Sequence, residues 1–170
     1  DKSCLKFINF CLNKFKYDRS IGGISGYSYV HDSKILENIK WFKLYRHCSW
    51  SWGTWRRVWE KVDWDINKIS INSKDFYKHK KKISKAGDDI CTLLIAQKNN
   101  MINSWAVRFN FHCIRKSLFS ISPRFSLTKN NGFGLEATHT LNFLNKKNIL
   151  FKNDNLKRLD QFKKPQLNYK

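Results

Sequence analysis

Five tryptophans lie between residues 50 and 64, and this density of large apolar rings constrains the fold more than any other feature of the sequence. Each indole has on the order of 200 Å² of surface to bury. Across the chain 41% of residues are hydrophobic and 15% aromatic, whereas only 7 Gly and 2 Pro occur. The chain therefore carries enough apolar surface for a packed core, which argues against wholesale disorder and against collagen-like or linker-like character.

Within this segment the spacing predicts a loop followed by a helix. Ser51 or Thr54 is suited to cap a helix that begins near residue 55. The residues that share its apolar face are Trp55, Val58, Trp59 and Val62. We expect the two tryptophans on this face to pack in the core. Trp50 and Trp52 precede the helix in a Ser- and Gly-rich loop, where an exposed indole can stack on the apolar C–H face of a sugar.

Three more segments show helical spacing of their apolar residues: residues 2–16, residues 88–97 and the residues that follow Ser104. Asp88 and Ser104 are the side chains that we expect to cap the last two of these helices. The first helix places cysteine and phenylalanine on its apolar face, whereas the others carry mainly aliphatic and aromatic residues.

Two segments have the pattern of strands, residues 20–29 and residues 119–128. Glycines within the first indicate close approach of another chain segment or of a ligand, and Pro123 in the second favours an edge strand. Segments with loop-like or weak patterns are residues 31–43, 66–85 and 130–139. Helices interleaved with short strands indicate an α/β fold with a mixed sheet flanked by helices.

The chain is strongly basic, with 33 Lys+Arg against 13 Asp+Glu and a formal net charge of +20. Such a balance attracts anionic partners, among them nucleic acid, acidic lipid head groups and sugar diphosphates. The run Lys78 to Lys82 is the densest part and suits a solvated surface or an acidic membrane. A basic nucleic-acid-binding module stays an alternative, although no recognised module signature is present.

The five cysteines include no C-x-x-C pair, which argues against a disulfide scaffold or a zinc ribbon and suits a reducing cytosol. No apolar run approaches the roughly 20 residues of a membrane helix. We therefore expect a cytoplasmic protein, with any contact to the inner face of the cytoplasmic membrane being peripheral.

Few residues have the arrangement of a metal site. Asp63-Trp64-Asp65 has the form of a D-x-D metal motif, but it trails a helix where such motifs end a buried strand. Neighbouring His and Cys point in different directions, so His47-Cys48 and His112-Cys113 are a poor zinc set. For a general base, the carboxylates to consider are Asp88, Asp89 and Glu136.

Three ordered blocks of residues resemble the bacterial family 2 glycosyltransferases found in surface-polysaccharide gene clusters. The blocks are Ile24 to Tyr27; Ser49 to Trp59 with Asp63-Trp64; and Asn103 to Phe109 with Pro123, Ser126-Leu127, Asn130 to Phe133 and Thr138-His139. They are similar, in that order, to the family's ISGY strand, to its segment S-x-W-x-W-x-T-W-x-R-x-W, and to its region from SWAIRW to NIGFDGSGTH.

The resemblance implies that residues 1–144 are the C-terminal part of a GT-A (Rossmann-like) glycosyltransferase domain and that residues 145–170 are a basic C-terminal extension. It implies inverting transfer of a sugar from a nucleotide sugar to a glycan or lipid-linked acceptor. In the family a divalent metal, Mg²⁺ or Mn²⁺, is held by an acidic motif that precedes the matched region. We therefore expect the chain to be part of a longer enzyme and to lack the main metal motif.

The resemblance also assigns roles to residues. These are Ser25, Gly26 and Tyr27 for the donor pocket, Trp50 and Trp52 for the sugar and the acceptor, and Asn103, Ser104 and Trp105 for the reaction centre. Arg108 is a counter-charge for the leaving diphosphate. His139 is placed to contact the diphosphate or the metal, and Glu136 to serve as a base or to contact the same groups.

The chain departs from the family pattern at its reaction centre. Asn103 stands where relatives often carry Asp, and an amide cannot act as a base. Gly134 to Ala137 replaces the sequence DGSG, and Ser51 replaces a glycine. Either the base lies elsewhere, for example at Glu136, or activity is lost, so an inactive glycosyltransferase remnant is a further alternative.

Overall fold

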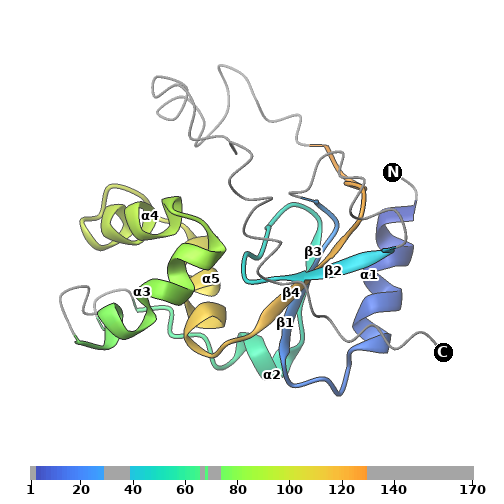
Figure 1. Ribbon diagram of the computed structural model, residues 1–170, viewed down its shortest axis with the longest axis horizontal. Helices are drawn as coiled ribbons and strands as arrows, with labels where there is room; N and C mark the ends of the chain where they lie inside the picture. The colour runs from blue at the N-terminus through green and yellow to red at the C-terminus, as the bar shows by residue number, and fades with distance from the viewer. Residues whose placement is uncertain (1–2, 29–38, 66–67, 69–73, 130–170) are drawn as a thin grey trace. The chain divides into compact units, whose positions relative to one another are not determined.

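The computed structural model describes residues 3–28, 39–65, 68 and 74–129, all of which belong to a compact unit that ends at Lys129 (Figure 1). The elements in chain order are α1 (Ser3–Lys14), β1 (Ile21–Ser25), β2 (Trp41–Leu44), β3 (Trp52–Gly53), α2 (Arg56–Trp59), α3 (Lys74–Ala86), α4 (Asp89–Lys98), α5 (Trp105–Arg115) and β4 (Phe119–Pro123). The helices and strands form a mixed α/β arrangement, which agrees with the fold class predicted from the sequence. The sheet has four strands.

The sheet has the strand order β2-β4-β1-β3. Its central strands β1 and β4 are parallel, whereas β2 and β3 pair antiparallel with them on the two sides. The expectation that Pro123 marks an edge strand is therefore wrong, because β4 is hydrogen-bonded on both sides. Pro123 is the last residue of β4, where a missing N–H interrupts the ladder least.

Helix α1 covers one face of the sheet. Its buried residues Cys4, Ile8 and Cys11 pack against isoleucines of the central strands. Ile21 and Ile24 both reach this face although they are three residues apart, because the register of β1 against β4 shifts between Ile21 and Gly23. The extra residue reverses the normal alternation of side chains and so lets both isoleucines share one core.

The opposite face of the central strands meets α5 and the segment after β2. A Cβ at Gly22 would lie 2.9 Å from Leu118 Cβ and 3.0 Å from Cys113 Sγ, and one at Gly23 would lie 2.9 Å from the His47 ring. The close approach predicted from these glycines is confirmed, and the partner is the chain itself. Glycine is needed at both positions, because a side chain at Gly22 would collide with Leu118 and Cys113 and one at Gly23 with the His47 ring.

Helices α3, α4 and α5 pack together through a second core of Ile83, Ala86, Ile90, Leu94, Val107, Phe111 and Ile114. Helix α3 lies in a segment that we expected to show a weak pattern. The expectation of a weak pattern is wrong for this part, because the apolar residues of α3 fall on one face and its lysines on another. Among its described side chains, Ile83 and Ala86 are buried in this core. The predicted helices 2–16 and 88–97 are found as α1 and α4.

Two caps and one loop differ from expectation. Asp88 precedes α4 with helical φ and ψ of −68° and −23°, and its side chain makes no capping hydrogen bond. Helix α2 has only four residues, and Thr54 does not cap it but donates to the Gly22 carbonyl at 2.6 Å. The predicted loop 31–43 ends in strand β2, since β4, far along the chain, supplies its hydrogen-bond partners.

Ser104 caps α5 as predicted, because its hydroxyl accepts a hydrogen bond from the Val107 N–H. The predicted boundary at residue 144 lies outside the described residues. Among the helices that the structure describes, none combines the length and the apolar character that crossing a membrane requires.

Replacing Gly23 by alanine is expected to lower the free energy of unfolding by about 1–3 kcal/mol, since the new methyl would press on a planar ring that cannot fold aside. Gly53→Ala is the matched control, because its methyl would meet the flexible ends of Leu12 and Ile8 at 3.1 and 3.2 Å. Urea titrations of both variants measure the difference. A loss of stability as large in the control as in Gly23→Ala would contradict this view of the contact.

Candidate functional site

A cluster of aromatic rings joins β3, α2 and the start of α5. Trp52 stacks on Trp105 with ring centroids 4.7 Å apart and an interplanar angle of 29°. Trp59 lies 4.4 Å from Trp64 and 6.1 Å from Trp105 between centroids. Phe109 is fully buried beneath these rings, whereas Trp59 is 37% exposed. We call these five residues the aromatic cluster; it runs from the core to the surface.

Arg108 and Asn103 lie beside the aromatic cluster. The Arg108 guanidinium donates through Nη1 to the Trp64 carbonyl at 3.3 Å and through Nη2 to Asn103 Oδ1 at 2.9 Å. Its Nε is buried and has no hydrogen-bond partner among the described residues. A guanidinium is thus held at the Trp64 carbonyl beside the aromatic cluster, and Nη1 and Nη2 each keep a second N–H beyond these hydrogen bonds.

The carboxyl end of β1 forms the second half of the candidate site. Ser25 pairs in register with Trp52, and its hydroxyl accepts from the Tyr27 N–H at 3.1 Å. The Gly26 N–H donates to the Ser51 carbonyl at 2.6 Å. The rings of Tyr27 and Trp50 meet edge to face at 4.6 Å.

Gly26 and Tyr27 are constrained by their surroundings. A Cβ at Gly26 would lie 2.6 Å from Cys4 Sγ, so a side chain is excluded there without movement of α1. Burial raises the pKa of the Tyr27 hydroxyl, and the nearby Cys48 acts in the same direction. Tyr27 therefore stays a neutral hydroxyl at physiological pH.

Strand β3 connects the two halves. The backbone of Trp52 pairs with Ser25, while its ring enters the aromatic cluster. The structure thus brings together nine of the residues that the sequence singles out: Ser25, Gly26, Tyr27, Trp50, Trp52, Asn103, Ser104, Trp105 and Arg108. Ser25, Gly26 and Tyr27 lie at or just after the carboxyl end of the central strand β1, the usual place for ligands in sheets with parallel strands.

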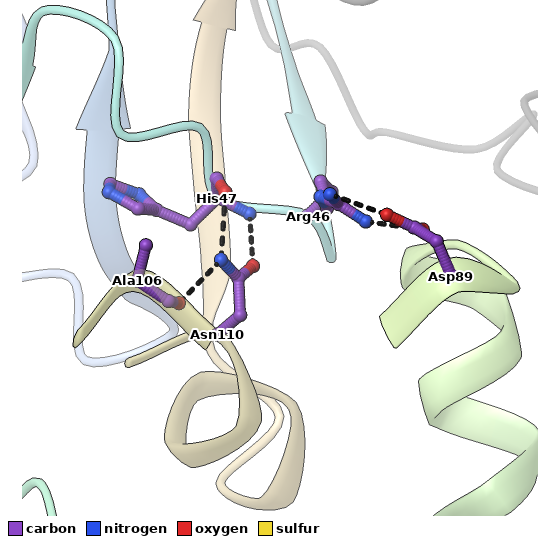
Figure 2. A network of polar contacts seen from close by, with 5 residues as sticks. All are labelled: Arg46, His47, Asp89, Ala106 and Asn110. Atoms are coloured by element: carbon purple, nitrogen blue, oxygen red, sulfur yellow. Dashed lines mark hydrogen bonds and ion pairs between the residues drawn. The ribbon is translucent and has the colours of Figure 1, made fainter. Parts of the chain in front are cut away.

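An asparagine that the sequence analysis does not single out supports this region from below. Asn110 on α5 is buried, and its Oδ1 accepts from the His47 N–H at 2.8 Å. Its Nδ2 donates to the carbonyls of His47 and Ala106, both at 2.9 Å (Figure 2). One amide therefore satisfies both backbone groups of His47.

The His47 ring is enclosed by Trp52 and Phe109 at centroid distances of 5.2 and 4.7 Å. Burial lowers its pKa to about 3, and the adjacent Arg46 acts in the same direction. The imidazole is therefore neutral at physiological pH. It lies 3.4 Å from the Ser120 hydroxyl through Nδ1 and supports the aromatic cluster as a packed ring.

A bidentate ion pair ties the same segment to the helices. Arg46 donates to both carboxylate oxygens of Asp89, at 2.7 and 2.9 Å, as Figure 2 shows at the start of α4. Both side chains are about a quarter exposed or less. Asp89, considered above as a base, is thereby engaged in a structural contact.

The remaining predicted residues fall elsewhere. Glu136 and His139 lie outside the described residues. Asp63 and Asp65 are exposed after α2, where Asp63 accepts from the Asp65 N–H at 3.2 Å. Within the described ranges, no three His, Cys, Asp or Glu side chains gather closely enough to hold a metal ion.

The sequence contained a signal for Asn110. It lies three residues after Val107 and four before Ile114, so a helical projection puts it among buried neighbours. A polar side chain there must find partners inside the protein. Trp59 and Trp64 were expected as core or as part of a metal motif, and only their spatial proximity shows that they belong to the aromatic cluster.

Comparisons with protein-family models, with curated proteins and with solved structures found no match to this chain.

Substituting Asn110 by leucine, which has a similar size, is expected to lower the free energy of unfolding by about 2–4 kcal/mol, because two buried backbone groups of His47 lose their partner. Denaturant titration monitored by tryptophan fluorescence measures the change. The same substitution at the exposed Asn13 serves as the control and should cost little. Unchanged stability of Asn110→Leu would show that the amide does not hold the segment.

The buried imidazole predicts a dependence of stability on pH. The unfolded chain takes up a proton at His47 near the ordinary pKa of 6.5, but the folded chain only near 3. The stabilisation that the neutral His47 ring gives to the folded state is fully present above pH 6.5. Below this pH the free energy of unfolding falls by about 1.4 kcal/mol per pH unit, because the unfolded chain binds one more proton than the folded chain. Burial lowers the pKa of His112 too, so the wild-type slope includes both groups.

His47→Phe keeps a ring and removes the titrating group. Between about pH 6 and pH 4 the free energy of unfolding of this variant should fall less steeply than that of the wild type. The difference in slope should correspond to the uptake of close to one proton on unfolding. Urea titrations at several pH values give both slopes. Identical slopes for the two proteins would show that His47 is not the buried group that takes up the proton.

Proposed function

We propose that this chain is the C-terminal, acceptor-side portion of a GT-A glycosyltransferase that transfers a sugar from a nucleotide sugar to a glycan or lipid-linked acceptor in surface polysaccharide biosynthesis. The observation that carries the proposal is the hydrogen bond that holds the Arg108 guanidinium at the Trp64 carbonyl, within the aromatic cluster. The ordered sequence blocks described above support it independently.

Each part of this arrangement suits one part of a nucleotide sugar. The C–H faces of a pyranose are apolar and stack on indole rings, which the aromatic cluster offers at its partly exposed end. A guanidinium binds phosphate oxygens and stabilises the negative charge that develops on a leaving diphosphate. The Nε of Arg108 is buried, so a phosphate would be bound through the further N–H groups of Nη1 and Nη2.

The metal in this proposal is Mg²⁺ or Mn²⁺, which would supply further charge stabilisation to the diphosphate. The described residues offer no group that holds such an ion, and His139 lies outside them. The proposed work of the described residues is to bind the sugar, orient the diphosphate and shape the acceptor side.

Asn103 acts in this proposal as a positioning residue. Its Oδ1 accepts from Arg108 Nη2 and so fixes the guanidinium beside the aromatic cluster. An aspartate at this position would form an ion pair with the same guanidinium instead of standing free as a base. Glu136 is then the candidate general base. If Glu136 does not act as the base, the chain belongs to an inactive glycosyltransferase remnant.

The proposal is tested by binding measurements on the full chain with defined probes, UDP-glucose, UDP-galactose and GDP-mannose. Arg108→Gln is expected to lower the affinity for a bound nucleotide sugar about tenfold or more, because a charged hydrogen bond is lost. Lys116→Gln is the matched control, since Lys116 is exposed at the end of α5. Calorimetric titration gives both affinities.

Two outcomes would count against the proposal. One is that none of the three probes binds; the other is that the control variant weakens binding as much as Arg108→Gln. A titration with a single-stranded oligonucleotide tests the nucleic-acid alternative. Tight oligonucleotide binding whose logarithm falls steeply with the logarithm of salt concentration would favour that alternative.

A further inference from the structure

Helix α1 has an outer face on which lysines and large apolar side chains are exposed together. Leu5 is 72% and Phe10 53% exposed, and Tyr17, just after the helix, is 80% exposed. Lys6 and Lys14 lie four residues to either side of Phe10 and are exposed as well. Residues four apart lie on the same side of a helix, so these three form one stripe.

Aromatic rings and ammonium groups meet on this stripe. Lys14 Nζ lies 6.0 Å from the centre of the Phe10 ring and 5.5 Å from that of Trp41 on β2. Lys16 Nζ lies 5.5 Å from the Tyr17 ring. The two rings of Phe10 and Trp41 are 6.0 Å apart, so the patch extends from the helix onto the edge strand of the sheet.

This surface carries charge of one sign. The sequence from residue 2 to residue 17 contains no Asp or Glu. The first carboxylate after it, Asp18, is occupied by the Ser20 hydroxyl at 2.6 Å and by Lys43 at 3.6 Å. The lysines of α1 therefore present their charge to solvent without a neighbouring carboxylate of the helix.

We propose that this face of α1 docks on an anionic lipid surface. Phe10 and Tyr17 would enter the head-group region, where aromatic rings are stable, while the lysines contact acidic head groups. The long alkyl chains of the lysines allow the ammonium groups to stay among the polar head groups while the aromatic rings insert more deeply. The inference does not rest on the proposed function, since it concerns a different surface.

One feature favours a lipid surface over nucleic acid at this place. The Phe10 ring is covered by the Lys14 ammonium, which suits the water boundary of a membrane better than stacking of a base. The exposed Tyr77 and the exposed lysines of α3 provide the comparison for this face.

Vesicle sedimentation of the full chain tests the proposal, with phosphatidylcholine vesicles that contain or lack phosphatidylserine. Binding is expected only with phosphatidylserine. The double variant Lys6→Gln with Lys14→Gln should lose about fivefold in partitioning for each lysine. Phe10→Ala should lose about fivefold although it leaves the charge unchanged.

Matched variants on α3 separate this face from the general charge of the chain. Lys80→Gln with Lys81→Gln removes two exposed lysines, and Tyr77→Ala removes a ring that is 62% exposed. Both should bind vesicles within about twofold of the wild type. Equal losses from the α3 variants, or no loss from the α1 variants, would overturn the proposal.

The same variants are titrated with a single-stranded oligonucleotide. If the α1 variants lose oligonucleotide binding in parallel while vesicle binding is unchanged, the face binds nucleic acid and the lipid proposal is overturned. Circular dichroism spectra of all variants confirm that the substitutions, which lie at exposed positions, leave the helix content intact.

Discussion

The hydrogen bonds between the Asn110 amide and the backbone of His47 are the contact on which the rest of the structure depends. They fix the chain where it leaves β2 and begins the tryptophan-rich segment. From this point Arg46 reaches α4 and the His47 ring fills the space above Gly23. Sheet, helices and aromatic cluster therefore meet at this segment, and the buried amide is stable there because both of its polar atoms are hydrogen-bonded.

Local signals in the sequence predicted three of the helices. The apolar residues of α1 and α5 lie on one face, α4 was predicted although its apolar residues are not confined to one face, and the Ser104 cap is confirmed. Helix α3 has a clear apolar face and was missed. Prediction also failed where a distant partner decides the structure. Strand β2 becomes a strand because β4 pairs with it, and β4 lies inside the sheet despite Pro123. Thr54 bonds the Gly22 carbonyl in place of capping α2, a contact that only the assembled sheet offers.

The candidate site was predictable as a set of residues more than as an arrangement. Trp52 and Trp105, far apart in the sequence, were both singled out, but only the fold shows that they stack. The sequence marks Asn103 as an amide where relatives often carry a carboxylate. The structure shows that its side chain accepts a hydrogen bond from the Arg108 guanidinium. Side-chain identity indicates chemistry, whereas the partner that a group finds depends on contacts between elements that no local pattern encodes.

The parallel pairing of β1 with β4 has a consequence for how the chain acquires its structure. Ile21 pairs with Phe119, so the innermost ladder of the sheet joins the beginning and the end of the described fold. Contacts of such large sequence separation form slowly, because a long loop must close before they contribute. During synthesis β1 and β2 cannot be joined in one sheet until β4, which pairs with both of them, has been made. In a chain that stops before residue 119, the strands of the sheet are divided into two separate parts.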